Sequence, residues 1–174
     1  MTMIDYFFAL DIKKPWVFIT EEAISRDDTL KKPLLLEIIP KNILLLELDA
    51  ALMQGREGMY REFAAVMKFP DYFGNNYNAL DDCMTDLQWL PADGYLLLIK
   101  NSEFLLSKED DGVLKGLLSI LDSAGEEWTK PVKLGDWWGN RDGLPFHTIL
   151  ELNKGKAAAF RERLKKINFD VENL

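Results

Sequence analysis

The stretch FPDYFGNNYNALDDCMTDL, residues 69–87, carries the strongest local pattern in the chain. Pro70 and Gly74 indicate a short loop, and apolar residues then recur every three or four positions, as along one side of a helix. These apolar residues are Tyr77, Leu80, Met84 and Leu87. The opposite side is polar and consists of Asn78, Asp81, Asp82, Thr85 and Asp86. The spacing predicts a helix from about Asn76 to Gln88, with Asn75 or Asn76 capping its first turn.

The predicted helix has an acidic side without compensating bases. Residues 69–99 contain five aspartates and no lysine or arginine. Surface carboxylates on helices usually alternate with bases four residues away, whereas Asp82 and Asp86 form a mildly repulsive like-charge pair. Such an uncompensated acidic face favours a surface on which a basic partner binds.

The same residues resemble the signature of the barstar family, the intracellular inhibitors of a secreted bacterial ribonuclease. The shared residues are Pro70, Asp71, Tyr72, Phe73, Gly74, Asn76, Ala79, Leu80, Asp82, Cys83 and Thr85. Outside this stretch only the order of elements agrees, over about residues 43–152. The resemblance implies an α/β fold with a small parallel β-sheet and helical crossovers, to which this chain adds N-terminal strands and a C-terminal helix.

The resemblance also assigns Tyr72, Gly74 and Asp82 to the partner-binding set, with Asp82 reaching deepest into the ribonuclease site. Aspartates there would take the positions of RNA phosphates among cationic side chains. Tyr72 and Phe73 would add flat contact area, and Gly74 would let the loop turn tightly. The predicted partner-binding surface, called the acidic surface below, consists of Tyr72, Phe73, Gly74, Asn76, Asn78, Asp81, Asp82 and Asp86.

Three departures from the family pattern leave the partner's identity open. Asn78 stands where the family has an acid, and Asp81 stands where it has a tryptophan. A further acid of the family, on the following helix, is matched to Lys115. The partner is therefore expected to be a basic protein, either a ribonuclease or a different toxin.

Composition favours a single soluble-type domain over residues 1–174. The chain is 48% hydrophobic and has a net charge of -8, which disfavours nucleic acid as a partner because phosphate binding needs a basic footprint. Acidity that serves solubility alone is the other explanation of the charge. We divide the domain into an N-terminal extension (1–42), a barstar-like core (43–152) with a long insertion at 126–145, and a C-terminal helix (153–174).

Apolar runs predict buried strands at 43–48, 95–99 and 146–152. A helix is expected over 57–68, and a Ser-x-x-acid capping signal at Ser107 predicts another that ends near Gly125. Residues 6–8, 16–19 and 34–36 are expected to form extra strands. The lysines and arginines of the C-terminal helix are expected to form its solvated outer face.

The sequence disfavours catalysis, and no cofactor or metal is expected. The one cysteine, Cys83, lies beside aspartates near the buried side of its helix, which would raise its pKa. The one histidine, His147, lies within a predicted strand. Cys and His are too few for a metal site, which leaves an oxygen-ligand site at Asp81, Asp82 and Asp86 as the metal alternative.

A single cysteine and the lack of a secretion signal or a membrane-length apolar run predict a cytoplasmic protein. The leading hypothesis is an inhibitor, immunity protein or antitoxin that blocks a basic ribonuclease or related toxin. The alternative is a non-inhibitory regulatory or scaffold domain of barstar-like fold that docks elsewhere, for example through Trp137 and Trp138. An enzyme that uses acidic residues with a divalent ion is the third hypothesis.

Overall fold

A computed structural model describes residues 12–24, 43–133 and 140–174. Its centre is a five-stranded sheet in the order β2-β3-β6-β1-β7, in which every neighbouring pair is parallel. The strands are β1 (Val17–Thr20), β2 (Ile43–Asp49), β3 (Gly94–Lys100), β6 (Phe146–Glu151) and β7 (Glu172–Asn173). The predicted α/β fold with a parallel sheet is confirmed.

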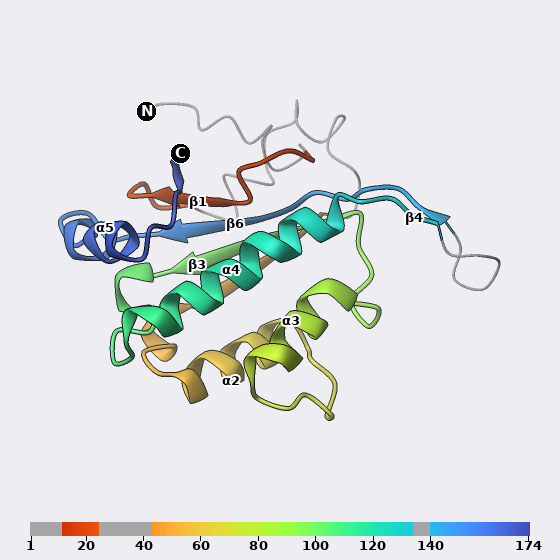
Figure 1. The fold of residues 1–174 in the computed structure, drawn as a ribbon, viewed down its shortest axis with the longest axis horizontal. Coiled ribbons are helices and arrows are strands. Elements are labelled where there is room, and N and C mark those ends of the chain that lie inside the picture. The colour runs from red at the N-terminus through yellow and green to blue at the C-terminus, as the bar shows by residue number, and fades with distance from the viewer. Residues whose placement is uncertain (1–11, 25–42, 134–139) are drawn as a thin grey trace.

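Helices make the crossovers between the strands (Figure 1). They are α2 (Arg56–Val66), α3 (Tyr77–Asp86), α4 (Asp111–Trp128) and α5 (Ala157–Lys166). Two helices, α2 and α3, connect β2 to β3, and α4 connects β3 to β6. The short 3-10 turns η2 (Ala50–Leu52) and η3 (Ser102–Phe104) follow β2 and β3.

All four of these helices pack on one face of the sheet. Alternate residues of β3 show this, because Tyr95 and Leu97 belong to the main core with the helices, while Leu96 and Leu98 belong to a smaller cluster. The smaller cluster covers the other face and includes Ile24. Strands apolar on both faces are typical of a parallel sheet that is covered on both sides.

Polar side chains join the carboxyl ends of β2, β3 and β6. Asn101 donates through Nδ2 to Asp49 Oδ1 at 2.8 Å, and Asn153 donates to Asn101 Oδ1 at 2.9 Å. Each of these residues lies at or just after the end of its strand. The bonds therefore fix the relative positions of three strand ends.

The predicted start of α4 is wrong by three residues. Asp110, and not Ser107, caps the helix, and its Oδ1 accepts from the Val113 backbone N–H at 3.1 Å. The residues before it are held elsewhere, since the Leu106 and Lys108 backbone amides donate to carbonyls of the loop after η2. This non-local pairing keeps the Ser107 segment out of the helix.

The predicted end of α4 near Gly125 is also wrong, because the helix continues to Trp128. A Cβ atom at Gly125 would lie 2.4 Å from Trp16 Cγ, so the glycine serves close packing on that ring. The insertion predicted at 126–145 thus loses its first residues to α4. It contains the antiparallel pair β4 (Val132–Lys133) and β5 (Asn140–Arg141), while Trp137 and Trp138 lie outside the described residues.

The ends of the chain contribute to the same sheet. The strand predicted at 16–19 is confirmed as β1, whereas those predicted at 6–8 and 34–36 lie outside the described residues. The predicted C-terminal helix is α5, and the chain then returns as β7 beside β1, which was not predicted. Arg161 and Arg163 of α5 form ion pairs with Glu21 and Asp111, respectively. The prediction that the basic residues of this helix form a solvated outer face is therefore wrong for these two.

Candidate functional site: the acidic surface of α3 and its preceding loop

Asn76 is the N-cap residue of α3, and both the oxygen and the nitrogen of its side-chain amide form hydrogen bonds within the protein. Its Oδ1 accepts from the Ala79 backbone N–H at 3.0 Å, and its Nδ2 donates to the Gly74 carbonyl at 3.1 Å. Leu80, Cys83 and Met84 are buried below the helix. Asn76 therefore serves as the helix cap, and its predicted contact with a partner remains untested.

We expect Asn76→Ala to lower the free energy of unfolding by about 1 kcal/mol, because it removes the cap. The matched control is Asn78→Ala, which changes an exposed asparagine two residues later on the same helix. It should leave stability within about 0.5 kcal/mol of wild type. Urea unfolding measures both, and equal effects of the two variants would contradict the capping role.

Two hydrogen bonds from aromatic side chains seat α3 on α4. Tyr77 Oη donates to the Val113 carbonyl at 2.5 Å, and its ring lies so close to Gly116 that a Cβ atom there would be 2.7 Å away. At the other end, Trp128 Nε1 donates to the Met84 carbonyl at 2.8 Å. Burial raises the pKa of Tyr77 to about 12, so its hydroxyl stays protonated as a donor.

An aromatic cluster fixes the loop before α3. The Phe73 ring packs edge-on against Phe69 at 4.9 Å and Tyr60 at 6.0 Å between centroids, and Trp89 Nε1 donates to the Met67 carbonyl. Phe73 is half-buried as a result. Its neighbour Tyr72 is 76% exposed, so the loop presents one aromatic side chain and is anchored by the next.

The expected role of Gly74 in turning the loop is wrong. The residue with a left-handed backbone is Asn75, at φ 49°, and Gly74 has no such conformation. A Cβ atom at Gly74 would instead lie 2.9 Å from Asn76 Nδ2. The glycine thus leaves room for the side chain that caps α3.

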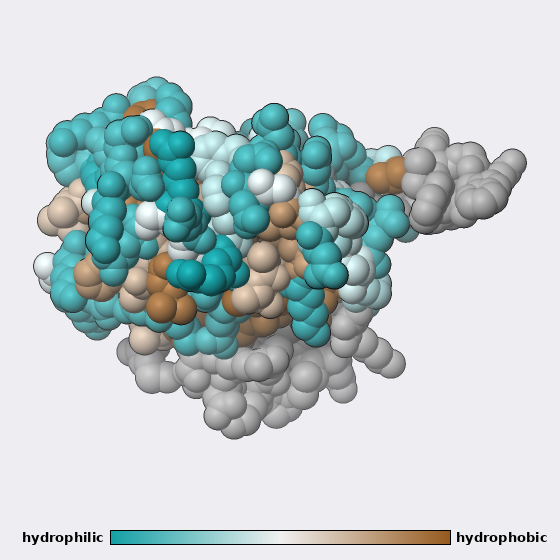
Figure 2. All heavy atoms as spheres, turned by 90° about the horizontal axis from the view of Figure 1, so that it is seen from below, coloured by the Kyte–Doolittle hydropathy of each residue, from teal (hydrophilic) through white to brown (hydrophobic). Residues whose placement is uncertain are grey.

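The polar side of α3 faces solvent as predicted. Asn78, Asp81, Asp82 and Asp86 are all exposed, and no ion pair within the described ranges involves any of the three aspartates. Figure 2 shows the molecule from below the view of Figure 1, which is the side on which α2 and the loop before α3 lie. Hydrophilic side chains cover most of the described surface on this side. The carboxylates are therefore available to an external cation.

A depression of about 260 Å³ lies between α3 and α4, next to this polar side. Its lining residues are Tyr77, Asn78, Asp81, Gly116, Ser119, Ile120 and Ser123. Lys115 does not line it, and the α4 residues that do are Gly116, Ser119, Ile120 and Ser123. Partial burial and the neighbouring Asp82 raise the pKa of Asp81, the one carboxyl group of this depression.

The two residues weighed as nucleophile or base lie in the interior. Cys83 is buried, and burial, followed by Asp82 and Asp86, raises the pKa of its thiol. His147 is buried within β6, with the rings of Trp16 and Phe18 beside it at 5.4 and 5.7 Å. Within the described residues, no group of three or more His, Cys, Asp or Glu is placed to hold a metal ion. The helices described there are also too short or too polar to span a membrane.

The order of these elements and the acidic surface agree with a known protein family. The family model described as Barstar (barnase inhibitor) matches residues 43–151, from the first residue of β2 to the last residue of β6. The match contains α2, α3, α4 and the whole acidic surface. No curated protein matches the chain.

Proposed function

The chain belongs to the barstar family, and from this premise we propose that it is an inhibitor or immunity protein for a basic ribonuclease or related toxin. It binds the partner's active site through the acidic surface. The observation that carries the proposal is the set of exposed carboxylates on α3, none of which forms an ion pair with another described residue. A ribonuclease site holds phosphate with cationic side chains, and carboxylates form charge-assisted hydrogen bonds to the same groups.

The rigidity of the surface supports the proposal. The hydrogen bonds of Tyr77 and Trp128 and the packing of Phe73 fix the helix and the loop that carry the carboxylates and Tyr72. A preorganised surface loses little conformational entropy on association. We expect tight binding without rearrangement of the loop, and the protein itself acts without catalysis, cofactor or metal. A cytoplasmic location belongs to the same proposal, because that is where a cell's RNA needs protection.

A capture experiment tests the proposal. The purified chain is used as bait in an extract and culture medium of the source cell, and captured proteins are identified and assayed for RNA cleavage after release. We expect a basic protein that degrades RNA once it is separated from the chain. Capture of proteins that neither cleave RNA nor act as toxins would contradict the proposal.

We expect the rate of association with that partner to fall as salt rises, because the attraction is between opposite charges. An increase from about 0.02 M to about 0.5 M salt should lower the association rate constant about tenfold or more. Dissociation should change less. Stopped-flow fluorescence measures both rates, and an association rate independent of salt would exclude electrostatic steering by the acidic surface.

One observation favours the alternative of a non-inhibitory scaffold domain. Every residue that lines the depression with Asp81, Asn78 among them, is uncharged, so the acidic surface carries less charge there than a fully acidic site would. A scaffold would bind its partner through another face. Its binding would then be unaffected by Asp82→Ala, whereas binding through the acidic surface would be weakened.

A further inference from the structure

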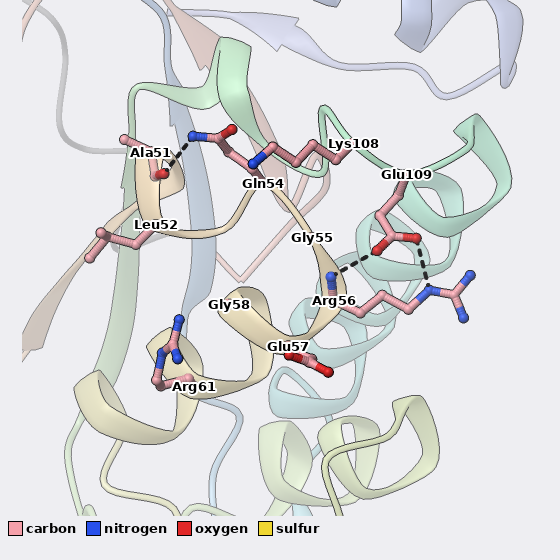
Figure 3. Close-up of a pocket in the computed structure, with 10 residues that line it drawn as sticks. All are labelled: Ala51, Leu52, Gln54, Gly55, Arg56, Glu57, Gly58, Arg61, Lys108 and Glu109. Atoms are coloured by element: carbon pink, nitrogen blue, oxygen red, sulfur yellow. Dashed lines mark hydrogen bonds and ion pairs between the residues drawn. The ribbon is translucent and has the colours of Figure 1, made fainter.

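A second concave surface lies at the opposite end of α2 from the acidic surface. It has a volume of about 720 Å³, within the range of about 300–1,000 Å³ that is typical of ligand sites, and it is open to solvent. Its lining residues are Ala51, Leu52, Gln54, Gly55, Arg56, Glu57, Gly58, Arg61, Lys108 and Glu109, shown in Figure 3. We call it the α2 concavity.

The α2 concavity gathers three cations in a chain whose net charge is -8. One is already neutralised, since Arg56 Nε lies 3.2 Å from Glu109 Oε2 and the Arg56 backbone amide donates to Glu109 Oε1 at 3.0 Å. Arg61 and Lys108 take part in no ion pair within the described ranges. Figure 3 shows these two side chains on opposite sides of the space, with Arg56 turned toward Glu109. Two exposed cations thus border one cavity, and among the described residues that line it Glu57 is the acid not paired with Arg56.

The surroundings of these cations fit a ligand with an apolar part. The α2 concavity is formed by the segment after the carboxyl end of β2, by the first turns of α2 and by the residues before α4. Leu52, on its wall, is 59% exposed and offers an apolar contact beside the cations. A Cβ atom at Gly58 would lie 2.2 Å from the Leu52 carbonyl oxygen, so the glycine lets α2 pack directly against η2 and fixes this wall.

We propose that the α2 concavity binds a small organic phosphate, with the phosphate between Arg61 and Lys108 and its organic group on Leu52. Arg61 can bind phosphate oxygens through a planar fork, and Lys108 adds a point charge. A phosphate dianion can place a charged oxygen on each of the two cations, whereas a single carboxylate would have to be shared between them, and Glu57 opposes either ligand. The site shares no residue with the acidic surface, so a failure of this proposal would not affect the proposed inhibitor function, nor the reverse.

The test uses phenyl phosphate as the probe, with inorganic phosphate in parallel, at constant ionic strength and a pH at which both are mostly dianions. Amide chemical shifts of the labelled full chain are followed by NMR during each titration. We expect saturable shifts confined to residues 51–61 and 108–109. Lys108→Gln and Arg61→Gln should each weaken phenyl phosphate binding about fivefold or more, because each removes a charge-assisted contact.

Three further variants give the matched comparisons. Glu57→Gln removes the opposing negative charge and should tighten the binding of both probes. Leu52→Asn should weaken the binding of phenyl phosphate and leave the binding of inorganic phosphate unchanged. Lys166→Gln removes an exposed cation from α5 and should change the affinity for neither probe. Shifts that do not saturate, or an equal loss in Lys166→Gln, would overturn the proposal in favour of general counter-ion attraction. All variants change exposed side chains, so their unchanged amide spectra confirm folding.

Discussion

Replacement of Asp82 by alanine is expected to weaken binding of the partner by at least about tenfold, the largest effect of any single change on the acidic surface. Asp82 is exposed near the middle of α3, and in the described structure no base of the protein itself neutralises it. A cation of the partner that pairs with Asp82 would be buried by the complex. Removal of the carboxylate would leave that cation without its mate, and titration calorimetry with the captured partner measures the loss.

The matched control is Asp93→Ala, which removes the same charge from an exposed turn outside α3. It separates a local contact from the general attraction between an acidic and a basic protein. We expect the control to bind within about threefold of wild type, as is usual for a rim charge that affects mainly association. Equal losses in both variants, or no loss in Asp82→Ala, would show that Asp82 makes no specific contact and would favour the scaffold alternative.

Replacement of Trp128 by alanine is expected to have the largest effect on stability, a loss of about 3–5 kcal/mol in the free energy of unfolding. Its ring is buried, stacks on Phe146 with an interplanar angle of 9°, and lies 5.1 Å from the Tyr95 ring between centroids. Its Nε1 also donates to Met84 at the end of α3. The variant therefore opens a cavity in the core and releases α3 from α4, and urea unfolding measures the cost.

Trp128→Phe separates the two contributions. The smaller ring keeps most of the aromatic packing but leaves the Met84 carbonyl without the indole N–H, so about 1–3 kcal/mol should be lost. Amide exchange should then rise in α3 more than in β3, because the indole bond fixes only the helix. A loss below about 1 kcal/mol in the alanine variant would show that Trp128 does not hold the core together.

Local sequence patterns predicted the elements whose determinants lie within a few residues. The spacing of Leu80 and Met84 was enough to place α3, and Asn76 caps it as one of the two residues expected to do so. Continuous apolar runs were enough to place β2, β3 and β6 in a parallel sheet. These predictions succeeded because helical periodicity and strand burial are read from adjacent residues.

Predictions that depended on distant contacts failed. Ser107 and Asp110 are both good caps, and the choice between them is made by hydrogen bonds from the Leu106 and Lys108 amides to the loop after η2. Gly125 looked like a helix end, but its small size serves contact with Trp16, more than a hundred residues earlier. The groups that decide these two cases, the carbonyls after η2 and the Trp16 ring, lie far away in the sequence, so the local pattern does not contain them.

The candidate site likewise has features that the local sequence predicts and features that depend on distant contacts. Exposure of Asp81, Asp82 and Asp86 followed from their spacing opposite the apolar side, and the structure places them there. Which α4 residues lie beside Asp81 depends on how α3 packs against α4, including the close approach of Tyr77 to Gly116. The resemblance matched Lys115 to an acid of the family, and Lys115 is not among the residues that line the depression.

The most direct test of the account is the pattern by which the chain inhibits its captured ribonuclease. If the carboxylates of α3 occupy the place of RNA phosphates, the chain and RNA cannot bind the ribonuclease at the same time. Initial rates of cleavage of a short RNA should show a rising KM with unchanged kcat as the chain is added, and Asp82→Ala should need a correspondingly higher concentration. A chain that binds the ribonuclease but leaves RNA cleavage unchanged, or lowers kcat without affecting KM, would contradict it.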